Sequence, residues 1–564
     1  MSEQKQEKVF GIDLGTTYSC ISYIDEHGKP VVLKNSEGEL TTPSVVFFES
    51  ADDVTVGASA KESSKMYPDQ VVSFIKRSMG VPNSNLVINN ITMSPEEISS
   101  YILKKCVKDA TDTLRMESKL DENEEIKKVV ITCPAYFGIN ERTATQKAGE
   151  IAGLEVLQII NEPTAAAITY GVTDDKTAKT VLIYDLGGGT FDITMIDIKP
   201  GEIKVICTGG DHNLGGKDWD DKILLYLDDE FQTQTKSKDS VLEDPETLQE
   251  LSLSAEKAKK LLSSKDKAPI AINYNGKRAR VELTREKFDS LTKDLLERTI
   301  SLTQTMFKEA EAKGYKQSDV SEILLVGGSS KMPQVAKRVE EAFGIKTKMF
   351  DPDESVAKGA AIYASRQTEF NSIIDEIADK TGKSKEEVKK ELDSGKSLDN
   401  MAKDANVDTS RRMYIGGADD VKITNVTSRS FGTVAYTQNN EKKLFNLIKK
   451  NDALPAVAKN EFFPMSDGQD TAEFIVMENL STDEMIDVSM GSEIGKAKLE
   501  LPSGITKDVK IEVEFRLNES GLLELKASES KSGKVVEAKF ETKNALTDEE
   551  KMTAIRRMDS STVN

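Results

Sequence analysis

Histidine is scarce in this chain, with only His27 and His212 among 564 residues. This scarcity nearly excludes a Ser-His-Asp triad and any metal site built from several histidines. Cysteine is also sparse and forms no CxxC pair: Cys20, Cys106, Cys133 and Cys207. We expect these four thiols to be buried apolar fillers rather than metal ligands or disulfide partners.

Long apolar runs are absent, since no segment approaches the ~18–20 apolar residues that span a membrane. The first residues, MSEQKQEK, lack the apolar stretch of a secretory signal. These features predict a cytoplasmic protein with no membrane partner. The formal net charge of −20 argues against nucleic acid as a partner, while leaving room for a local basic pocket. The length predicts several domains.

A glycine-rich hairpin at residues 181–198, VLIYDLGGGTFDITMIDI, is the main motif. Two apolar strands flank a turn that holds Asp185, three glycines at 187–189 and Thr190. Glycines without Cβ atoms let backbone N–H groups approach an anion closely. Asp185 is placed for a hydrated Mg²⁺, and the Thr190 hydroxyl for a phosphate oxygen. For this hairpin alone, a plain turn is an equally good interpretation.

A second copy of the pattern, VFGIDLGTTYSCISYID, lies at residues 9–25. It has a short apolar strand, Asp13, Gly15, the pair Thr16 and Thr17, and a returning strand. A duplication on this scale predicts two similar lobes. If both turns face one cleft, they converge on a polyphosphate and its metal.

Three further features are ambiguous when each is taken alone. Lys76 lies near the end of a segment at 57–80 that we predict to be helical; it fits either a solvated helix end or a γ-phosphate contact. Glu162, at a strand–helix junction, fits either Mg²⁺-bound water or the helix dipole. The motif ILLVGGSSK at 323–331 fits a nucleoside contact only weakly. A small-residue helix at 355–364 suits close packing under the cleft.

Together the motifs resemble the seventy-kilodalton heat-shock chaperone family, of the bacterial DnaK type. The matching pieces are GIDLGTTYSC, IKRSMG, CPAYF, AGLEV, IINEPTAAAITYG, YDLGGGTFD, AEKAKKLLSS, LLVGGSSKMP and DPDESVAKGAA. The resemblance implies an α/β actin-like two-lobed ATPase domain, followed by a small helical insertion and a β-sandwich domain. It also implies ATP/ADP and Mg²⁺ as cofactors, with K⁺ as an additional candidate.

The resemblance assigns roles residue by residue. The catalytic residues would be Lys76, Glu162, Asp185, Asp192 and Thr190, and Asp13 and Asp185 would hold the metal through water. The carboxylates around the metal and the attacking water would be Asp13, Glu162, Asp185 and Asp192. The nucleotide would be bound by Asp13, Gly15, Thr16, Thr17, Tyr18, Gly187, Gly188, Gly189, Gly215, Gly216, Glu256, Lys259, Lys260, Ser263, Gly327, Gly328, Ser329, Lys331 and Asp353. Pro134 and Arg142 fall where the family has a nucleotide-state switch.

Several positions depart from the family pattern. Lys331 replaces an adenine-stacking arginine, and we expect a lower nucleotide affinity because lysine lacks the planar guanidinium. Lys422 and Thr424 interrupt the apolar linker, which predicts weaker coupling of the two halves. Asn425 replaces the linker acid, and Gln158 stands where the family has an arginine used with J-domain co-chaperones. These changes weigh against stimulation by a J-domain partner. Whether a nucleotide exchange factor is also a partner is left open by the sequence.

The predicted domains are 1–365 (ATPase), 366–416 (helical insertion), 417–425 (linker), 426–545 (sandwich) and 546–564 (shortened lid helix). In the insertion we expect separate helices at 369–380, 385–393 and 398–405, with some binding role. In the sandwich the arch over a peptide would involve Tyr436 and Met465. Without a long lid, a bound peptide should dissociate fast.

The leading functional interpretation is an ATP-dependent chaperone that binds unfolded, apolar polypeptide segments. The alternative is a nucleotide-bound scaffold or co-chaperone subunit that does not cycle. A sugar or acetate kinase on the same fold is disfavoured, because it leaves residues 420–558 unexplained and Lys76 already fills the γ-phosphate position.

Overall fold

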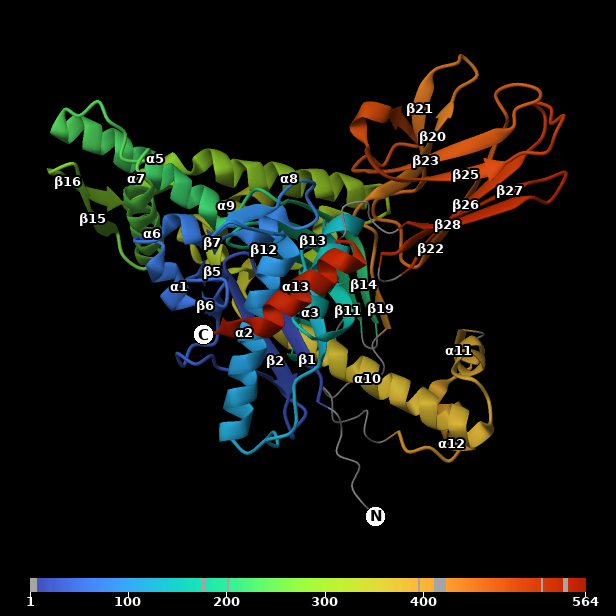
Figure 1. The fold of residues 1–564 in the computed structure, drawn as a ribbon, viewed down its shortest axis with the longest axis horizontal. Helices are drawn as coiled ribbons and strands as arrows, with labels where there is room; N and C mark the ends of the chain where they lie inside the picture. The colour runs from blue at the N-terminus through green and yellow to red at the C-terminus, as the bar shows by residue number, and fades with distance from the viewer. Residues whose placement is uncertain are drawn as a thin grey trace.

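The computed structural model describes residues 8–173, 178–199, 202–393, 396–409, 422–518, 521–540 and 546–564. Within these ranges no helix is both long and apolar enough to cross a membrane. Two lobes form one body, from which a sandwich and a small helical module project on one side (Figure 1).

The central sheets of the two lobes share one topology. The first runs in the order β11 (Glu155–Asn161), β10 (Lys128–Cys133), β1 (Phe10–Asp13), β2 (Tyr18–Ile24) and β3 (Pro30–Val32), with β4 (Thr42–Pro43) also paired to β2. The second runs β18 (Thr347–Met349), β17 (Val320–Val326), β12 (Lys179–Leu186), β13 (Phe191–Lys199), β14 (Glu202–Asp211) and β19 (Lys422–Thr424). In both, an antiparallel hairpin is continued by two parallel strands. The predicted duplication is therefore present.

Two helices that carry small residues where they meet join the lobes beneath the sheets. They are α4 (Glu162–Thr173) and α10 (Ser355–Thr381). A Cβ built on Gly359 would lie 1.8 Å from the carbonyl oxygen of Ala165, and one on Gly11 would lie 2.1 Å from Ala361 N. The backbones thus approach too closely for any side chain, and this contact fixes the floor of the cleft.

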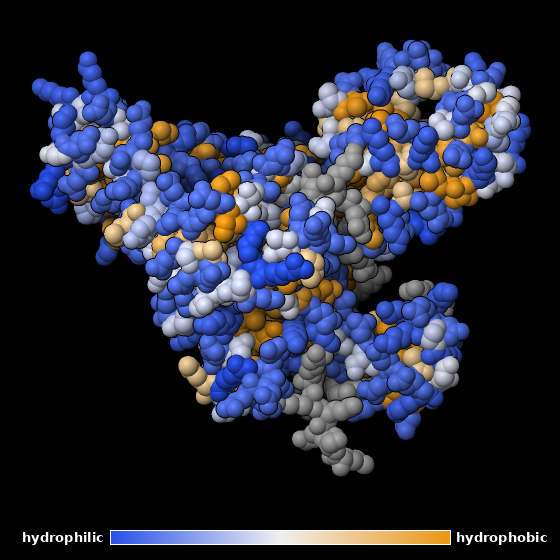
Figure 2. Space-filling model, in the orientation of Figure 1, coloured by the Kyte–Doolittle hydropathy of each residue, from blue (hydrophilic) through white to orange (hydrophobic). Residues whose placement is uncertain are grey.

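Outer layers complete each lobe around its own hydrophobic core. The first lobe adds β5 (Val45–Phe48), β6 (Asp53–Val56), β7 (Val71–Ser73), α1 (Ala58–Ser63), α2 (Pro95–Met116) and α3 (Ile139–Ile151). The second adds α5 (Gly216–Thr235), α6 (Pro245–Leu262), β15 (Lys267–Tyr274), β16 (Lys277–Thr284), α7 (Arg285–Leu291), α8 (Lys293–Glu311) and α9 (Pro333–Phe343). Figure 2 shows that the visible outer surface is largely hydrophilic, as expected when apolar side chains fill these cores.

Two local predictions are wrong. Residues 57–80 are not one helix: α1 is followed by the 3-10 turn η1 (Pro68–Gln70), the strand β7 and the 3-10 turn η2 (Ile75–Ser78). The helices expected at 355–364 and 369–380 are one continuous helix, α10. The first error arises because pairing of β7 with β5 overrides local helical propensity.

The segment after the two lobes packs against the far end of α10. There α11 (Lys385–Asp393) and α12 (Leu398–Asp404) surround a small apolar core. The core members are Ile373, Ile374, Ile377, Ala378, Val388, Leu398, Ala402 and Val407. The module projects from the body at the lower right of Figure 1.

A β-sandwich follows the linker. One sheet has the order β24 (Met485–Asp487), β21 (Lys442–Ile448), β20 (Ser430–Tyr436), β23 (Thr471–Asn479) and β25 (Ser492–Glu500). The other has β22 (Ala456–Phe462), β26 (Ile511–Leu517), β27 (Leu523–Glu529) and β28 (Val535–Phe540). Alternating apolar residues of these strands, among them Phe515 and Leu525, face the shared core.

The linker and the last residues both return to the two lobes. The linker strand β19 pairs in parallel with β14, so backbone hydrogen bonds attach it despite its polar side chains. Residues 417–421 of the predicted linker lie outside the described ranges. Helix α13 (Asp548–Ser560) packs on α3, and β29 (Thr562–Val563) pairs in parallel with β6. A capping box of Thr547 and Glu550 starts α13.

Candidate active site

A cavity of about 490 Å³ opens between the two lobes, a size that suits a nucleotide. Most predicted site residues line it: Asp13, Gly15, Thr16, Thr17, Tyr18, Lys76, Glu162, Asp185, Gly187, Gly188, Thr190, Glu256, Lys259, Lys260, Ser263, Gly327, Gly328, Ser329, Lys331 and Asp353. The others lie behind its wall: Gly189, Asp192, Gly215 and Gly216. The structure therefore brings residues from both hairpins to one place.

The turns of the two hairpins touch each other across the cavity floor. A Cβ on Gly188 would lie 2.1 Å from Thr17 Oγ1, and one on Gly189 would lie 2.2 Å from Thr16 Cγ2. Any side chain on either glycine would collide with the opposite lobe. The glycines are needed for this close approach.

Lys76 sits in the 3-10 turn η2 rather than at a solvated helix end. The left-handed conformation of Phe74, with φ of 60°, directs the chain into this turn. Lys76 Nζ lies 2.5 Å from Glu162 Oε1, and Lys76 is buried. Burial alone lowers the pKa of Lys76, but the charges of Glu162 and Asp13 outweigh it and raise the pKa. Lys76 therefore stays positively charged inside the site.

Three aspartates share this buried region. Burial and the charge of Glu162 raise the pKa of Asp13 to about 7. The same two causes raise the pKa values of Asp185 and Asp192 well above their ordinary range. The site holds four carboxyl groups, those of Asp13, Glu162, Asp185 and Asp192, but only one lysine, Lys76. One ammonium group cannot neutralise the charge of four ionised carboxylates.

This excess of negative charge fits a divalent cation. Within the described parts of the chain, no three His, Cys, Asp or Glu side chains come close enough to ligate an ion directly. A hydrated Mg²⁺ matches both observations, because Mg²⁺ keeps several of its waters in protein sites. The acids would then contact the ion through water.

Hydrogen bonds fix the orientation of two of the aspartates. Thr132 Oγ1 donates to Asp13 Oδ1 over 3.1 Å. The backbone N–H of Ala135 donates to Asp192 Oδ1 over 2.9 Å, whereas the buried Oδ2 has no hydrogen-bond partner in the described structure. An orphaned, buried carboxylate oxygen beside a phosphate cavity suits a polar partner such as water.

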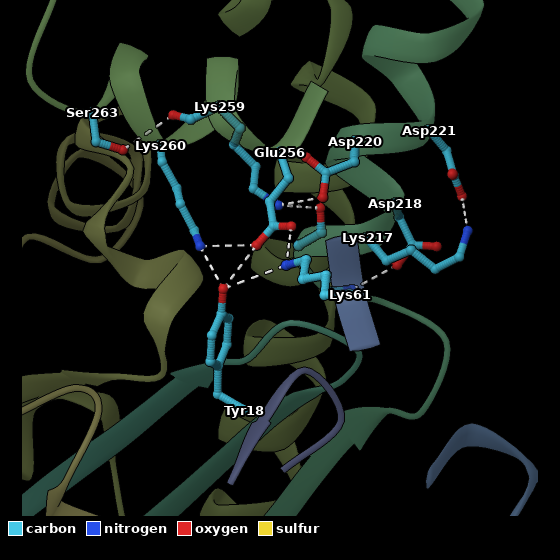
Figure 3. Close-up of polar contacts among 12 residues, drawn as sticks. Tyr18, Lys61, Lys217, Asp218, Asp220, Asp221, Glu256, Lys259, Lys260 and Ser263 are labelled. Carbon is cyan, nitrogen blue, oxygen red and sulfur yellow. Dashed lines mark hydrogen bonds and ion pairs between the residues drawn. The ribbon is translucent and has the colours of Figure 1, made fainter. Parts of the chain in front are cut away.

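Ion pairs close the mouth of the cavity between the lobes (Figure 3). Lys61 of α1 contacts Glu256 of α6 from the opposite lobe. Lys260 Nζ donates to Glu256 Oε1 over 2.9 Å and to the Tyr18 hydroxyl over 2.7 Å. Although burial opposes it, the charges of Lys61 and Lys260 lower the pKa of Glu256 to about 2. The cluster is a charged clamp across the cleft.

On the other side of the mouth, Lys331 pairs with Asp353. Both side chains are about half exposed, so the pair is available to a ligand. Gly327 has φ of 79°, and a Cβ there would lie 2.3 Å from Asp185 Oδ1. The third glycine motif therefore packs directly behind a predicted metal-binding carboxylate.

Sequence reasoning missed several residues that line the cavity: Lys61, Phe74, Lys217, Asp220 and Asp221. Lys259 Nζ contacts Asp220 Oδ2 over 2.6 Å and the carbonyl oxygen of Gly216 over 2.8 Å. Asp220 and Asp221 closely follow the glycines of the segment 209–216. Acidic residues directly after a glycine-rich loop are the sequence feature that could have predicted their place at the cavity. Nothing local marks Lys61, whose role depends on the opposite lobe.

The linker reaches the site through side-chain hydrogen bonds. Thr164 Oγ1 donates to Asn425 Oδ1 over 2.9 Å, two residues from Glu162. Arg142 contacts Asn161 Oδ1, beside Glu162. Gln158 Oε1 accepts a hydrogen bond from the Tyr363 hydroxyl over 2.8 Å. Asn425 therefore connects the linker to the helix that begins at Glu162.

Comparison with known proteins gives the family. The family model described as Hsp70 protein matches residues 9–90, 81–371 and 385–563. The chain is 43% identical over 368 residues to the Chaperone protein DnaK of Thermosipho melanesiensis, which covers 64% of this chain and 59% of that protein. It is 33% identical over 552 residues to the Chaperone protein DnaK of Halobacterium salinarum, which covers 96% of this chain and 76% of that protein.

The relative from Thermotoga neapolitana, also named Chaperone protein DnaK, is 43% identical over 370 residues, with 64% of this chain and 60% of that protein covered. The chain thus spans about three fifths of the length of the Thermosipho and Thermotoga relatives. The two lobes and the β-sandwich described above are consistent with this family. The chain belongs to the Hsp70 family.

Proposed function

We propose that this protein hydrolyses ATP and couples the hydrolysis to transient binding of extended apolar polypeptide segments. The observation that carries the proposal is the buried pair of Lys76 and Glu162 in a cavity lined by both lobes. Phosphoryl transfer to water needs positioning and charge neutralisation more than a strong base. This cavity offers both.

The roles follow from the geometry. Lys76 holds its charge in a buried place, where it would position the γ-phosphate and the attacking water. Glu162 fixes the ammonium group of Lys76 through their contact. Asp13 and Asp185 would hold a hydrated Mg²⁺, which when bound neutralises phosphate charge. The hydroxyls of Thr17 and Thr190 would donate to phosphate oxygens from opposite lobes.

The polypeptide site is proposed for the sandwich. Tyr436 and Met465 are about half exposed there, as a surface that contacts apolar segments requires. Helix α13 packs on the first lobe instead of covering the sandwich. We therefore expect a bound peptide to leave quickly, because differences in affinity lie mostly in dissociation rates.

The test is ATP turnover by the full chain with and without an extended apolar peptide. Stimulated turnover supports the proposal. The matched control is a peptide of equal length in which the apolar residues are replaced by serine. No turnover under either condition would reject the ATPase assignment.

A second candidate, a nucleotide-bound scaffold that does not cycle, has a specific observation in its favour. The linker strand β19 and the terminal strand β29 are both integrated in sheets of the ATPase lobes. Such pairing favours a fixed arrangement over large domain movements. Tight ATP binding without turnover would identify this candidate.

A further inference from the structure

The sandwich rests on both ATPase lobes through polar and apolar contacts. Ser428 Oγ donates to the carbonyl oxygen of Phe137 over 3.1 Å. Asn451 Oδ1 accepts from Thr208 N over 3.0 Å, and Lys450 pairs with Glu309 over 2.8 Å. Ile139, the first residue of α3, is buried among the core residues of the sandwich. All of these contacts are lost if the sandwich separates from the lobes.

Two carboxylates from different domains meet inside this interface. A Cβ built on Gly138 would lie 2.8 Å from Glu478 Oε2 of β23 and 3.1 Å from Glu141 Oε2 of α3. The distance between Glu478 Oε2 and Glu141 Oε2 therefore cannot exceed the sum of these two distances. Both atoms are buried, and neither has a hydrogen-bond partner among the described residues. Two charged carboxylates cannot share such a place without a large cost.

The surroundings of Glu478 do not supply a compensating ion pair. The charged groups that face it are Arg429, from the segment before β20, and Glu141. Its cross-strand neighbours, Phe431 on β20 and Ser492 on β25, are uncharged. The buried Nε of Arg429 has no hydrogen-bond partner in the described structure. Burial raises the pKa of Glu478 by more than the charge of Arg429 and a hydrogen bond from the backbone N–H of Ile139 lower it. A single proton shared by the two carboxyl groups would let one of them donate a hydrogen bond to the other. It would also remove the repulsion between two negative charges.

We propose that Glu478 and Glu141 form a proton-binding site between the sandwich and the first lobe, so that acidification favours the docked arrangement. Neither group belongs to the nucleotide cavity. The inference is independent of the proposed ATPase and peptide functions, because it concerns only the equilibrium between docked and separated domains.

The direction of the pH dependence follows from burial. In the docked protein, burial and the charge of Glu141 raise the pKa of Glu478 to about 7, from an ordinary value of 4.5. When the sandwich separates, water reaches Glu478 and its pKa returns towards that ordinary value. The docked form therefore binds the proton more tightly, and docking weakens as the pH rises through 7. The expected change in the docking constant is about tenfold between pH 6 and pH 8.

The test measures fluorescence energy transfer in the nucleotide-free full chain between pH 5.5 and pH 8.5. One dye is attached at Ala51→Cys on the first lobe and the other at Lys498→Cys on β25, since both positions are exposed and the four native cysteines are buried. We expect energy transfer to fall as the pH rises. The variant Glu478→Gln is a neutral isostere of the protonated acid, and it should stay docked with little pH dependence.

Two further variants complete the design. Glu141→Gln removes the repelling charge and should move the midpoint to lower pH, while Glu484→Gln, an exposed acid of the same domain, should behave like the unmodified chain. A pH-independent signal in the unmodified chain overturns the proposal. So does an unchanged pH dependence in folded Glu478→Gln; if that variant does not fold, an unmoved midpoint in Glu141→Gln decides against it.

Discussion

Lys76 and Glu162 form a buried ion pair, with Nζ 2.5 Å from Oε1, at the point where the two lobes meet. Lys76 comes from a short 3-10 turn of the first lobe. Glu162 begins α4, the helix that packs beneath both sheets. The pair thus ties a buried cation to the helix that packs beneath both sheets.

Replacing this lysine should abolish chemistry while sparing binding. For Lys76→Ala we expect ATP to bind but the single-turnover hydrolysis rate to fall about 10³-fold, equivalent to about 4 kcal/mol of barrier. The measurement is rapid-quench hydrolysis of bound ATP. Lys65→Ala is the matched control, because Lys65 makes only an exposed pair with Glu62. An unchanged rate in Lys76→Ala would remove this residue from the mechanism.

The clamp across the cavity mouth should control nucleotide release. Lys61 and Glu256 belong to opposite lobes, so the cleft cannot open without separating them. In Lys61→Ala we expect ADP to dissociate several-fold faster, since a partly buried pair contributes about 1 kcal/mol. Stopped-flow release of a fluorescent ADP measures this rate. Lys257→Ala, whose partner Glu62 lies 3.5 Å away on the exposed rim, should have a smaller effect. Equal rates in all three proteins would show that the clamp is not limiting.

Lys331 offers a change that should strengthen binding. A guanidinium stacks on an adenine ring better than an ammonium does, and it can still pair with Asp353. For Lys331→Arg we expect ADP affinity to rise by about three- to tenfold, measured by isothermal titration calorimetry. Lys346→Arg, an exposed position of the same lobe, is the control. A weaker or equal affinity would mean that Lys331 does not contact the base.

The two hairpins show how much of the site local sequence could predict. Asp13 and Asp185 each end a buried strand before a glycine turn, and the repetition of that pattern was enough to place both in one cleft. Lys76 and Glu162 were ambiguous individually, because their neighbours fit a solvated helix end or a dipole equally well. Only the resemblance to a family, and then the fold, separated these interpretations.

Long-range contacts account for what the sequence did not reveal. Lys61 faces Glu256 only after the lobes close around the cavity. The strand β7 replaces a predicted helix because β5 is available to pair with it. Glu478 and Glu141 are far apart in sequence, and each alone looks like an ordinary surface acid. Their burial depends on how the sandwich rests on the first lobe.

The glycine of α10 that touches α4 should not tolerate a side chain. A methyl group at position 359 would lie 1.8 Å from the carbonyl oxygen of Ala165, which is backbone and cannot rotate away. We expect Gly359→Ala to lower the free energy of unfolding of the ATPase lobes by about 3 kcal/mol. Urea denaturation followed by Trp219 fluorescence measures this loss, since Trp219 is the single tryptophan and is fully buried.

The matched control is another helical glycine. In α4, a Cβ on Gly171 would make only ordinary contacts of 3.6 and 3.7 Å with Ile198 and Ile203. Gly171→Ala should therefore stabilise the lobes by about 0.5–1 kcal/mol, because alanine loses less backbone entropy in a helix. Similar effects of the two substitutions would contradict the packing described for α4 and α10.

The terminal segment should contribute to the stability of the first lobe. Arg557 of α13 pairs with Glu97 of α2 over 2.9 Å, and the Glu97 side chain is only 6% exposed. Removing the arginine leaves a buried carboxylate without its partner, which costs about 1–3 kcal/mol. In Arg557→Ala we expect amide exchange to accelerate in β29 and β6, whose pairing holds the segment in place. Arg556→Ala, at an exposed position of the same helix, should leave exchange unchanged. If both variants exchange like the unmodified chain, the ion pair does not hold α13 against the lobe, and the apolar contacts of Ala554, Met558 and Val563 must be sufficient.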